Sequence, residues 1–210
     1  MGLISLFFQN PVGFFILAGL LLYSIIAHEV AHGWVASLFG DDTAKRYGRL
    51  TLNPAPHIDP MGLLMLFFVG FGWARPVPVN YSVLQRSRFG VIAVSFAGCL
   101  TNILIAIVAV FLLQIPAIDA NPLFSGVLYI LVRINIILGA FNLIPIPPLD
   151  GSRILMVLLP ERAKLRFARL EPYGLLIIAF LLFSGLLNPI ISFMQSLVYA
   201  FISVLQGMGR

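Results

Sequence analysis

Residues 12–38 read VGFFILAGLLLYSIIAHEVAHGWVASL and form an apolar run with one charged residue, Glu29. A helix that crosses the hydrocarbon core of a membrane needs about 20 mostly apolar residues, so this run is long enough. No Lys or Arg occurs in residues 1–40, and the run is longer than the apolar part of a secretory signal. We therefore expect a retained membrane helix. Its carboxylate indicates a functional site, because an unpaired charge inside a membrane is costly.

The composition of the whole chain also indicates a membrane protein. Of its 210 residues, 60% are apolar and 10% are charged, whereas soluble domains have roughly 45–50% and about 25%. This excludes a soluble globular enzyme, and it excludes disorder, which requires low hydrophobicity. The net charge is +5, but the basic residues lie in short loops between apolar runs. We expect one integral membrane domain over residues 1–210, in contact with the lipid bilayer and without a nucleic-acid partner.

Further apolar runs predict an all-α polytopic membrane protein with about five transmembrane helices. After the first run, crossings are predicted at 89–114, 122–144, 172–188 and 189–206. Asn188-Pro189 suits a tight turn, so the last two crossings are expected to form an antiparallel pair.

The interval near residues 49–80 is predicted to hold short helical or strand-like segments. Residues 61–73 are apolar, but as a helix they would extend about 20 Å, less than the ~30 Å of a hydrocarbon core. Residues 49–53 and 76–79 alternate in the way that is typical of extended edge segments. We expect 61–73 to enter the membrane and to return to the same side.

The basic residues favour this re-entrant path. If 61–73 returns, every Lys and Arg except Arg133 lies on one side of the membrane. The positive-inside rule then predicts a protein of the cytoplasmic membrane with its N-terminus outside, its C-terminus inside and its active site towards the cytoplasm. Arg133 lies within the run 122–144, and we interpret it as a structural partner for another helix or for a carbonyl group.

The motif His28-Glu29-Val30-Ala31-His32 lies near the inner end of the first run. Residues four apart on an α-helix differ by about 40° around its axis, so both imidazoles can reach one metal ion. Glu29 would then lie next to a water molecule that the metal activates. The competing interpretation is two interfacial histidines beside a glutamate that extends to the membrane surface.

A catalytic zinc site needs a third protein ligand, and Asp150, His57 and Asp59 are the candidates. Asp150 follows a proline-rich stretch that must break the preceding helix, so we expect it on irregular backbone at the inner membrane face, level with the two histidines. Its alternative role is to cap a helix over residues 151–159. His57 and Asp59 are interpreted chiefly as groups that form hydrogen bonds within the loop or to a residue that binds the metal.

Three motifs together resemble the site-2 protease family of intramembrane zinc metalloproteases. They are His28 to His32, Asn142 to Gly151 and, more weakly, Ala97 to Asn102 between them. By this resemblance His28, His32 and Asp150 would bind one Zn²⁺ per chain. Glu29 would be the catalytic carboxylate, and Asn142 would lie near the scissile carbonyl.

The chain departs from the family pattern at Cys99, where a proline is usual, and in the loop 115–121. That loop is too short for the extracytoplasmic PDZ domain of many members, so we expect a compact form without it and without a C-terminal regulatory domain. Cys99 is the single cysteine, and we expect it to be a small buried side chain.

Other polar residues within the runs have weaker predictions. Asn135 lies seven residues before Asn142 on the same helix face, so we expect both to point towards the metal. Asn102 is expected to bond across helices or to orient a loop. Ala97 and Gly98 are expected to serve close helix packing.

The sequence therefore predicts an intramembrane zinc endopeptidase that acts on membrane proteins with a transmembrane segment. The substrate must be unwound before attack, and we expect it to pair by strand addition with Leu50, Thr51, Leu52 and Asn53. The alternatives are a divalent-cation transporter that uses the same His, Glu and Asp groups, and a catalytically inactive binding scaffold. The sequence does not specify the oligomeric state.

Overall fold

The computed structural model describes residues 3–69, 72–84 and 87–208, and within these ranges it contains helices, turns and loops but no strand. In chain order the helices are α1 (Leu3–Gln9), α2 (Pro11–Leu38), α3 (Thr43–Arg46), η1 (Ala55–His57), α4 (Pro60–Val69), α5 (Tyr81–Leu84), α6 (Arg88–Leu113), α7 (Pro116–Asp119), α8 (Pro122–Asn142), α9 (Asp150–Leu158), α10 (Glu161–Ala168), η2 (Glu171–Tyr173), α11 (Gly174–Phe183) and α12 (Asn188–Met208). The all-α prediction is confirmed.

Three helices, α2, α6 and α8, are long and apolar enough to cross a membrane, as judged over the described residues. Each begins at a side chain that satisfies a free backbone N–H. The Asn10 side chain accepts from Gly13 N at 2.9 Å, the Ser87 hydroxyl from Gly90 N at 3.1 Å, and the Asn121 side chain from Leu123 N at 3.1 Å. The predicted crossings at 12–38, 89–114 and 122–144 match these helices within two residues.

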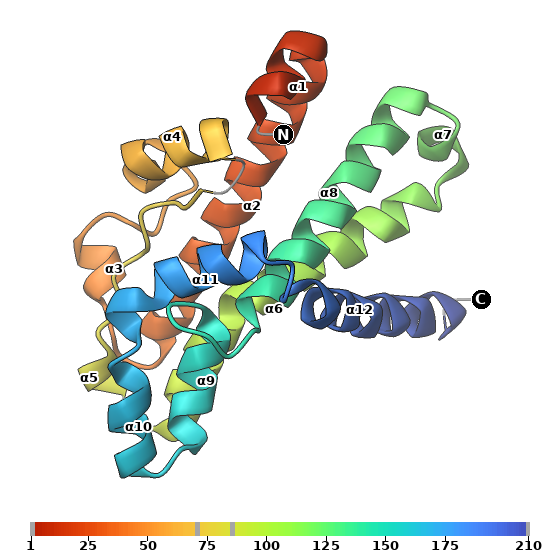
Figure 1. Cartoon of the computed structure of the whole chain (residues 1–210). Coiled ribbons are helices and arrows are strands. Elements are labelled where there is room, and N and C mark those ends of the chain that lie inside the picture. Colours follow the sequence, from red (N-terminus) through yellow and green to blue (C-terminus); the bar gives the residue numbers. More distant parts are fainter. Residues whose placement is uncertain (1–2, 70–71, 85–86, 209–210) are drawn as a thin grey trace.

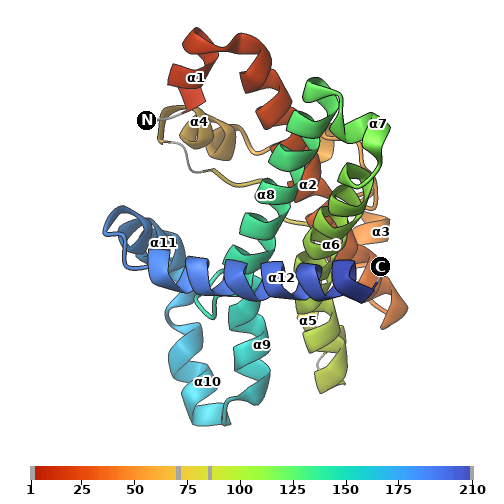
Figure 2. The ribbon, with the colours of Figure 1, turned by 90° about the vertical axis from the view of Figure 1, so that its right-hand side faces the viewer.

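Helix α6 packs against both α2 and α8 (Figures 1 and 2). Its contact with α8 is a buried cluster of Ala106 and Ala109 with Val132 and Ile136. Alanine side chains let two helix backbones approach closely, which is how helices associate in a membrane.

The chain between α2 and α6 runs back along α2 and then returns to the C-terminal end of that helix. We call the described part of this segment, residues 39–69 and 72–84, the excursion. The Phe67 ring of α4 lies 5.4 Å from the ring of Phe14, near the start of α2. Further along, Asn80 N donates to the Asp41 carboxylate, beyond the other end of α2, at 2.6 Å. Figure 1 shows α4 beside α1, with α5 at the opposite end of the molecule.

The C-terminal helices differ from the predicted antiparallel pair. Helix α11 has 10 residues and extends about 15 Å, which is too short for a crossing. In both views α12 runs across α6 and α8 rather than along them (Figures 1 and 2). Four polar residues of α12, Ser192, Ser196, Tyr199 and Ser203, recur every three or four positions, and Gln195 lies beside this series. The average apolarity of the run therefore conceals a polar stripe along one side of the helix.

Candidate metal centre

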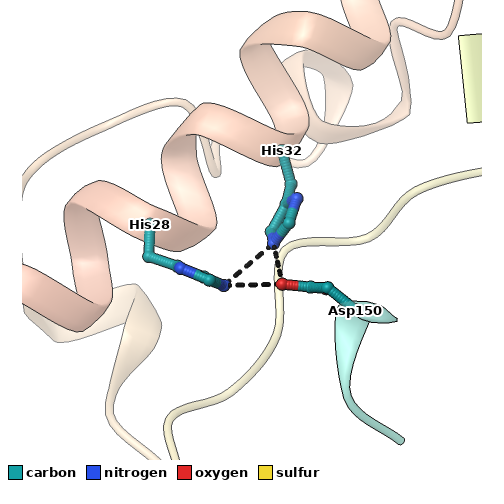
Figure 3. Close-up of side chains that lie close together, drawn as sticks. All are labelled: His28, His32 and Asp150. Atoms are coloured by element: carbon teal, nitrogen blue, oxygen red, sulfur yellow. Dashed lines mark hydrogen bonds and ion pairs between the residues drawn. The ribbon is translucent and has the colours of Figure 1, made fainter. Parts of the chain in front are cut away.

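Helix α2 positions His28 and His32 one turn apart on the same face, where both are buried. Their Nε2 atoms lie 3.0 Å apart, and the rings meet edge to face with centroids 4.7 Å apart. The helical spacing of the motif therefore brings two imidazole nitrogens to one point, as the sequence predicts (Figure 3).

Asp150 reaches the same point from the first turn of α9 (Figure 3). Its Oδ2 lies 3.0 Å from His28 Nε2 and 3.2 Å from His32 Nε2. Gly151 permits this approach, because a Cβ there would lie 2.1 Å from the Leu143 carbonyl oxygen. The first turn of α9 can thus fold tightly against the end of α8 and carry the carboxylate inwards.

The surroundings of Asp150 keep its carboxylate charged. Burial raises the pKa of Asp150, but the hydrogen bonds and charges of His28 and His32 outweigh burial and hold this pKa below its ordinary value. Two imidazole nitrogens and one carboxylate oxygen, all within 4.8 Å of one another, are the donor set that a catalytic zinc ion takes from a protein.

Gly98 on α6 leaves space beside these donors. A Cβ at this position would lie 2.5 Å from His28 Nε2 and 2.6 Å from His32 Nε2. Any larger residue would therefore fill the room in front of the two nitrogens, so the site has the shape as well as the chemistry for one zinc ion. The sequence assigned Gly98 only to helix packing, and no local pattern marks this second role.

Hydrogen bonds on the far side of each ring orient both histidines. His28 Nδ1 donates to Asn102 Oδ1 at 2.6 Å, and His32 Nδ1 donates to the Val94 carbonyl at 2.7 Å. Because both acceptors require a proton on Nδ1, Nε2 is the nitrogen of each ring that remains to bind a metal ion at the centre.

Asn102 is itself held by a buried relay, which we define as Asn102, Asn135 and Ser24 from α6, α8 and α2. Asn102 Nδ2 donates to Asn135 Oδ1 at 2.8 Å, and Asn135 Nδ2 donates to Ser24 Oγ at 2.9 Å. Asn102 and Asn135 are fully buried. Asn135 therefore touches His28 only through Asn102, rather than pointing at the metal position as its spacing from Asn142 predicts.

Glu29 has a backbone partner that no sequence pattern predicts. Its Oε2 accepts a hydrogen bond from Val77 N at 2.9 Å. Pro76 and Pro78 have no N–H, so Val77 is the single donor of this triplet. Arg49 fastens the same segment, because its Nη2 donates to the Arg75 carbonyl at 2.8 Å.

Several predicted site residues bond elsewhere. The Asn142 amide donates to Leu138 O of its own helix at 3.0 Å. Asp59 accepts from the first backbone N–H groups of α4. His57 is buried, with Nε2 2.9 Å from the Thr51 carbonyl. Both His57 and Asp59 thus hold the excursion together.

The predicted substrate-binding segment, residues 50–53, is irregular rather than strand-like, and Leu52 and Asn53 are exposed.

The chain is similar to zinc metalloproteases of bacteria and archaea. The model of peptidase family M50 matches residues 114–185. YwhC of Bacillus subtilis is 42% identical over 164 residues, 75% of each chain. Rip2 of Mycolicibacterium smegmatis is 32% identical over 84% of this chain and 70% of its own. MJ0392 of Methanocaldococcus jannaschii is 29% identical over 73% of this chain and 37% of its own. All three carry the name of a zinc metalloprotease, and no solved structure matches significantly.

Proposed function

Because the chain belongs to peptidase family M50, the site-2 protease family of zinc metalloproteases, we propose that it cleaves membrane proteins in or near their transmembrane segments. The observation that carries this proposal is the meeting of His28, His32 and Asp150 among three helices that are apolar enough to cross a membrane. A hydrolytic site in that position acts on peptide bonds that a soluble peptidase does not reach.

In this proposal His28, His32 and Asp150 hold one zinc ion. When bound, zinc supplies a Lewis acid that polarises the peptide carbonyl and lowers the pKa of water at the site. The space beside Gly98 and the outward bonds of both Nδ1 atoms support this assignment.

Glu29 is the proposed general base. It takes the proton of the attacking water and passes it to the leaving amine. The hydrogen bond from Val77 N fixes one carboxylate oxygen, so the other can turn towards the water. Asn142 is the proposed donor to the substrate carbonyl or backbone. Its amide must first release the Leu138 carbonyl.

The proposed substrate-binding segment is Leu50, Thr51, Leu52 and Asn53, which would pair with an unwound substrate through backbone hydrogen bonds. The exposure of Leu52 and Asn53 supports this role. Proline substitutions at alternate positions of 50–53 should reduce cleavage, because proline removes the N–H that such pairing needs. Unchanged cleavage would count against the segment.

The proposed location is the cytoplasmic membrane, with the N-terminus outside and the centre towards the cytoplasm. The return of the excursion to the end of α2 supports this orientation, because it brings Lys45, Arg46 and Arg88 to the same end of the bundle.

The experiment compares native protein with Glu29→Gln in proteoliposomes that contain a single-span reporter substrate. Native protein should retain zinc and cleave the reporter, with loss of cleavage on chelation. Glu29→Gln should retain zinc and lose cleavage. Cleavage by Glu29→Gln at the native rate would refute the proposed mechanism. Zinc flux without cleavage would indicate a transporter, and tight reporter binding without cleavage would indicate a scaffold.

A further inference from the structure

Arg133 lies near the middle of α8, on a face that the chain leaves exposed. Counting along α8, about 16 Å of helix separate it from Pro122 and about 13 Å from Asn142. Within the described residues it makes no hydrogen bond and no ion pair. The described residues of this chain therefore do not provide the partner helix or carbonyl that the sequence predicts for Arg133.

An unpaired guanidinium in this position is unfavourable in a lipid bilayer. Arginine stays protonated in proteins, so its charge is not removed by loss of a proton. Helix α8 also extends several turns beyond Arg133 in both directions. Arginines near helix ends can extend to the headgroups, but this one is further from either end of α8 than its side chain can extend. The charge therefore requires a partner at the same depth.

The long apolar helices of a second copy offer no free carboxylate. Helices α6, α8, α11 and α12 contain no Asp or Glu, and α2 contains only Glu29, which is bonded to Val77. Asp119 lies in α7, beyond the start of α8. Copies related by a two-fold axis through this face would place two Arg133 side chains together, which is repulsive.

We propose that Arg133 recognises a transmembrane helix of another membrane protein that carries Asp or Glu at mid-membrane. Guanidinium and carboxylate groups form two parallel hydrogen bonds, which satisfy both charges without water. Tyr129 and Ile137, one turn before and after Arg133, are exposed on the same face and supply apolar contact. Gly126 also has open space in front of it, so a partner helix can approach closely there.

The test measures binding rather than cleavage, so it does not depend on the peptidase proposal. Glu29→Gln protein is reconstituted in bilayers of zwitterionic lipid together with a fluorescent Leu/Ala-rich single-span peptide. The peptide carries Asp or Asn at its centre, and association is read by energy transfer. The Asp peptide should bind about fivefold more tightly than the Asn peptide, as expected for one polar contact in a membrane.

Variants at position 133 test whether Arg133 causes the preference for the Asp peptide. Arg133→Gln should bind both peptides equally, and Arg133→Glu should prefer a peptide with a central Lys. Leu104→Gln, which places the same polar residue on an exposed position of α6, should keep the preference for Asp. Zinc content verifies that each variant is folded. Equal binding of Asp and Asn peptides by protein with Arg133, or an unchanged preference in Arg133→Gln, would overturn the proposal.

Discussion

The metal centre and the excursion both bury polar groups, but they hold them differently. At the centre, the buried relay bonds side chains of different helices to one another, as in the contact of Asn102 with Asn135. In the excursion, side chains bond to backbone, as His57 does to the Thr51 carbonyl and Asp41 to the Asn80 amide. A bond between two side chains is lost when either residue changes, whereas a backbone partner persists. The centre should therefore be the more sensitive region.

The largest effect is expected at Gly98. Gly98→Ala places a methyl group within 2.6 Å of both Nε2 atoms, so zinc retention and reporter cleavage should fall by about 100-fold or more. Metal analysis and cleavage assays measure the change. Gly19→Ala is the matched control, because a Cβ at this position of α2 has nothing within 4 Å. Full zinc occupancy in Gly98→Ala would show that the space beside the histidines is not where the metal binds.

The second-largest effect is expected in the buried relay. Asn102→Leu removes the acceptor of the His28 ring, so zinc affinity should fall by about 10–100-fold, measured by chelator competition. Asn135→Leu should have a smaller effect in the same direction, because it acts through Asn102. Ser125→Ala should leave affinity unchanged, because this hydroxyl donates to Asn121 O at the start of α8. Equal affinities in all three variants would remove the distinction between the two regions.

Loss of the Val77 N–H, which lies where the two regions meet, should have an intermediate effect on activity. Val77→Pro deletes the N–H that holds Glu29, so kcat should fall about tenfold while bound zinc is unchanged. Val77→Ala keeps this N–H and should retain kcat. If both variants lose kcat equally, the Val77 side chain matters and its amide does not.

The smallest effect is expected in the excursion at Asp41. Burial raises its pKa, but hydrogen bonds from Thr43 and Asn80 outweigh burial and lower it below the ordinary value. The carboxylate therefore contributes stability above about pH 4, and this contribution is lost as the pH falls through the lowered pKa. Asp41→Asn should cost about 1 kcal/mol at pH 7, read as a lower Tm.

The deficit of Asp41→Asn should shrink at acidic pH, because protonated Asp41 no longer stabilises the native protein. Asp42→Asn is the matched control, since Asp42 is the exposed neighbour and should show no comparable deficit. A deficit that stays constant from pH 7 to acid would contradict the role of the charge.

The sequence predicted what local periodicity encodes. The spacing of His28 and His32 on one helix, the three long apolar runs and the return of the chain before Arg88 all depend on neighbours in sequence or on average charge. Asp150 was one of three candidates for the third position. The proline-rich stretch before it indicated a broken helix, and the structure brings it to the histidines.

The remaining features depend on contacts between distant segments. Gly98 lies at the metal position only because α6 crosses α2 at that point. Val77 reaches Glu29 only because the excursion returns along α2. The orientation of α12 depends on which of its faces packs on α8, and the average apolarity of residues 189–206 contains no such information.

The order of the three donors along the chain has a consequence for biosynthesis. His28 and His32 leave the ribosome more than a hundred residues before Asp150. A nascent chain with α2 and α6 inserted holds two imidazoles and Glu29 but lacks the carboxylate that completes the set. The three donors are therefore incomplete during most of translation, and the enzyme can become active only after α8, the last of the three long helices, has been inserted into the bilayer.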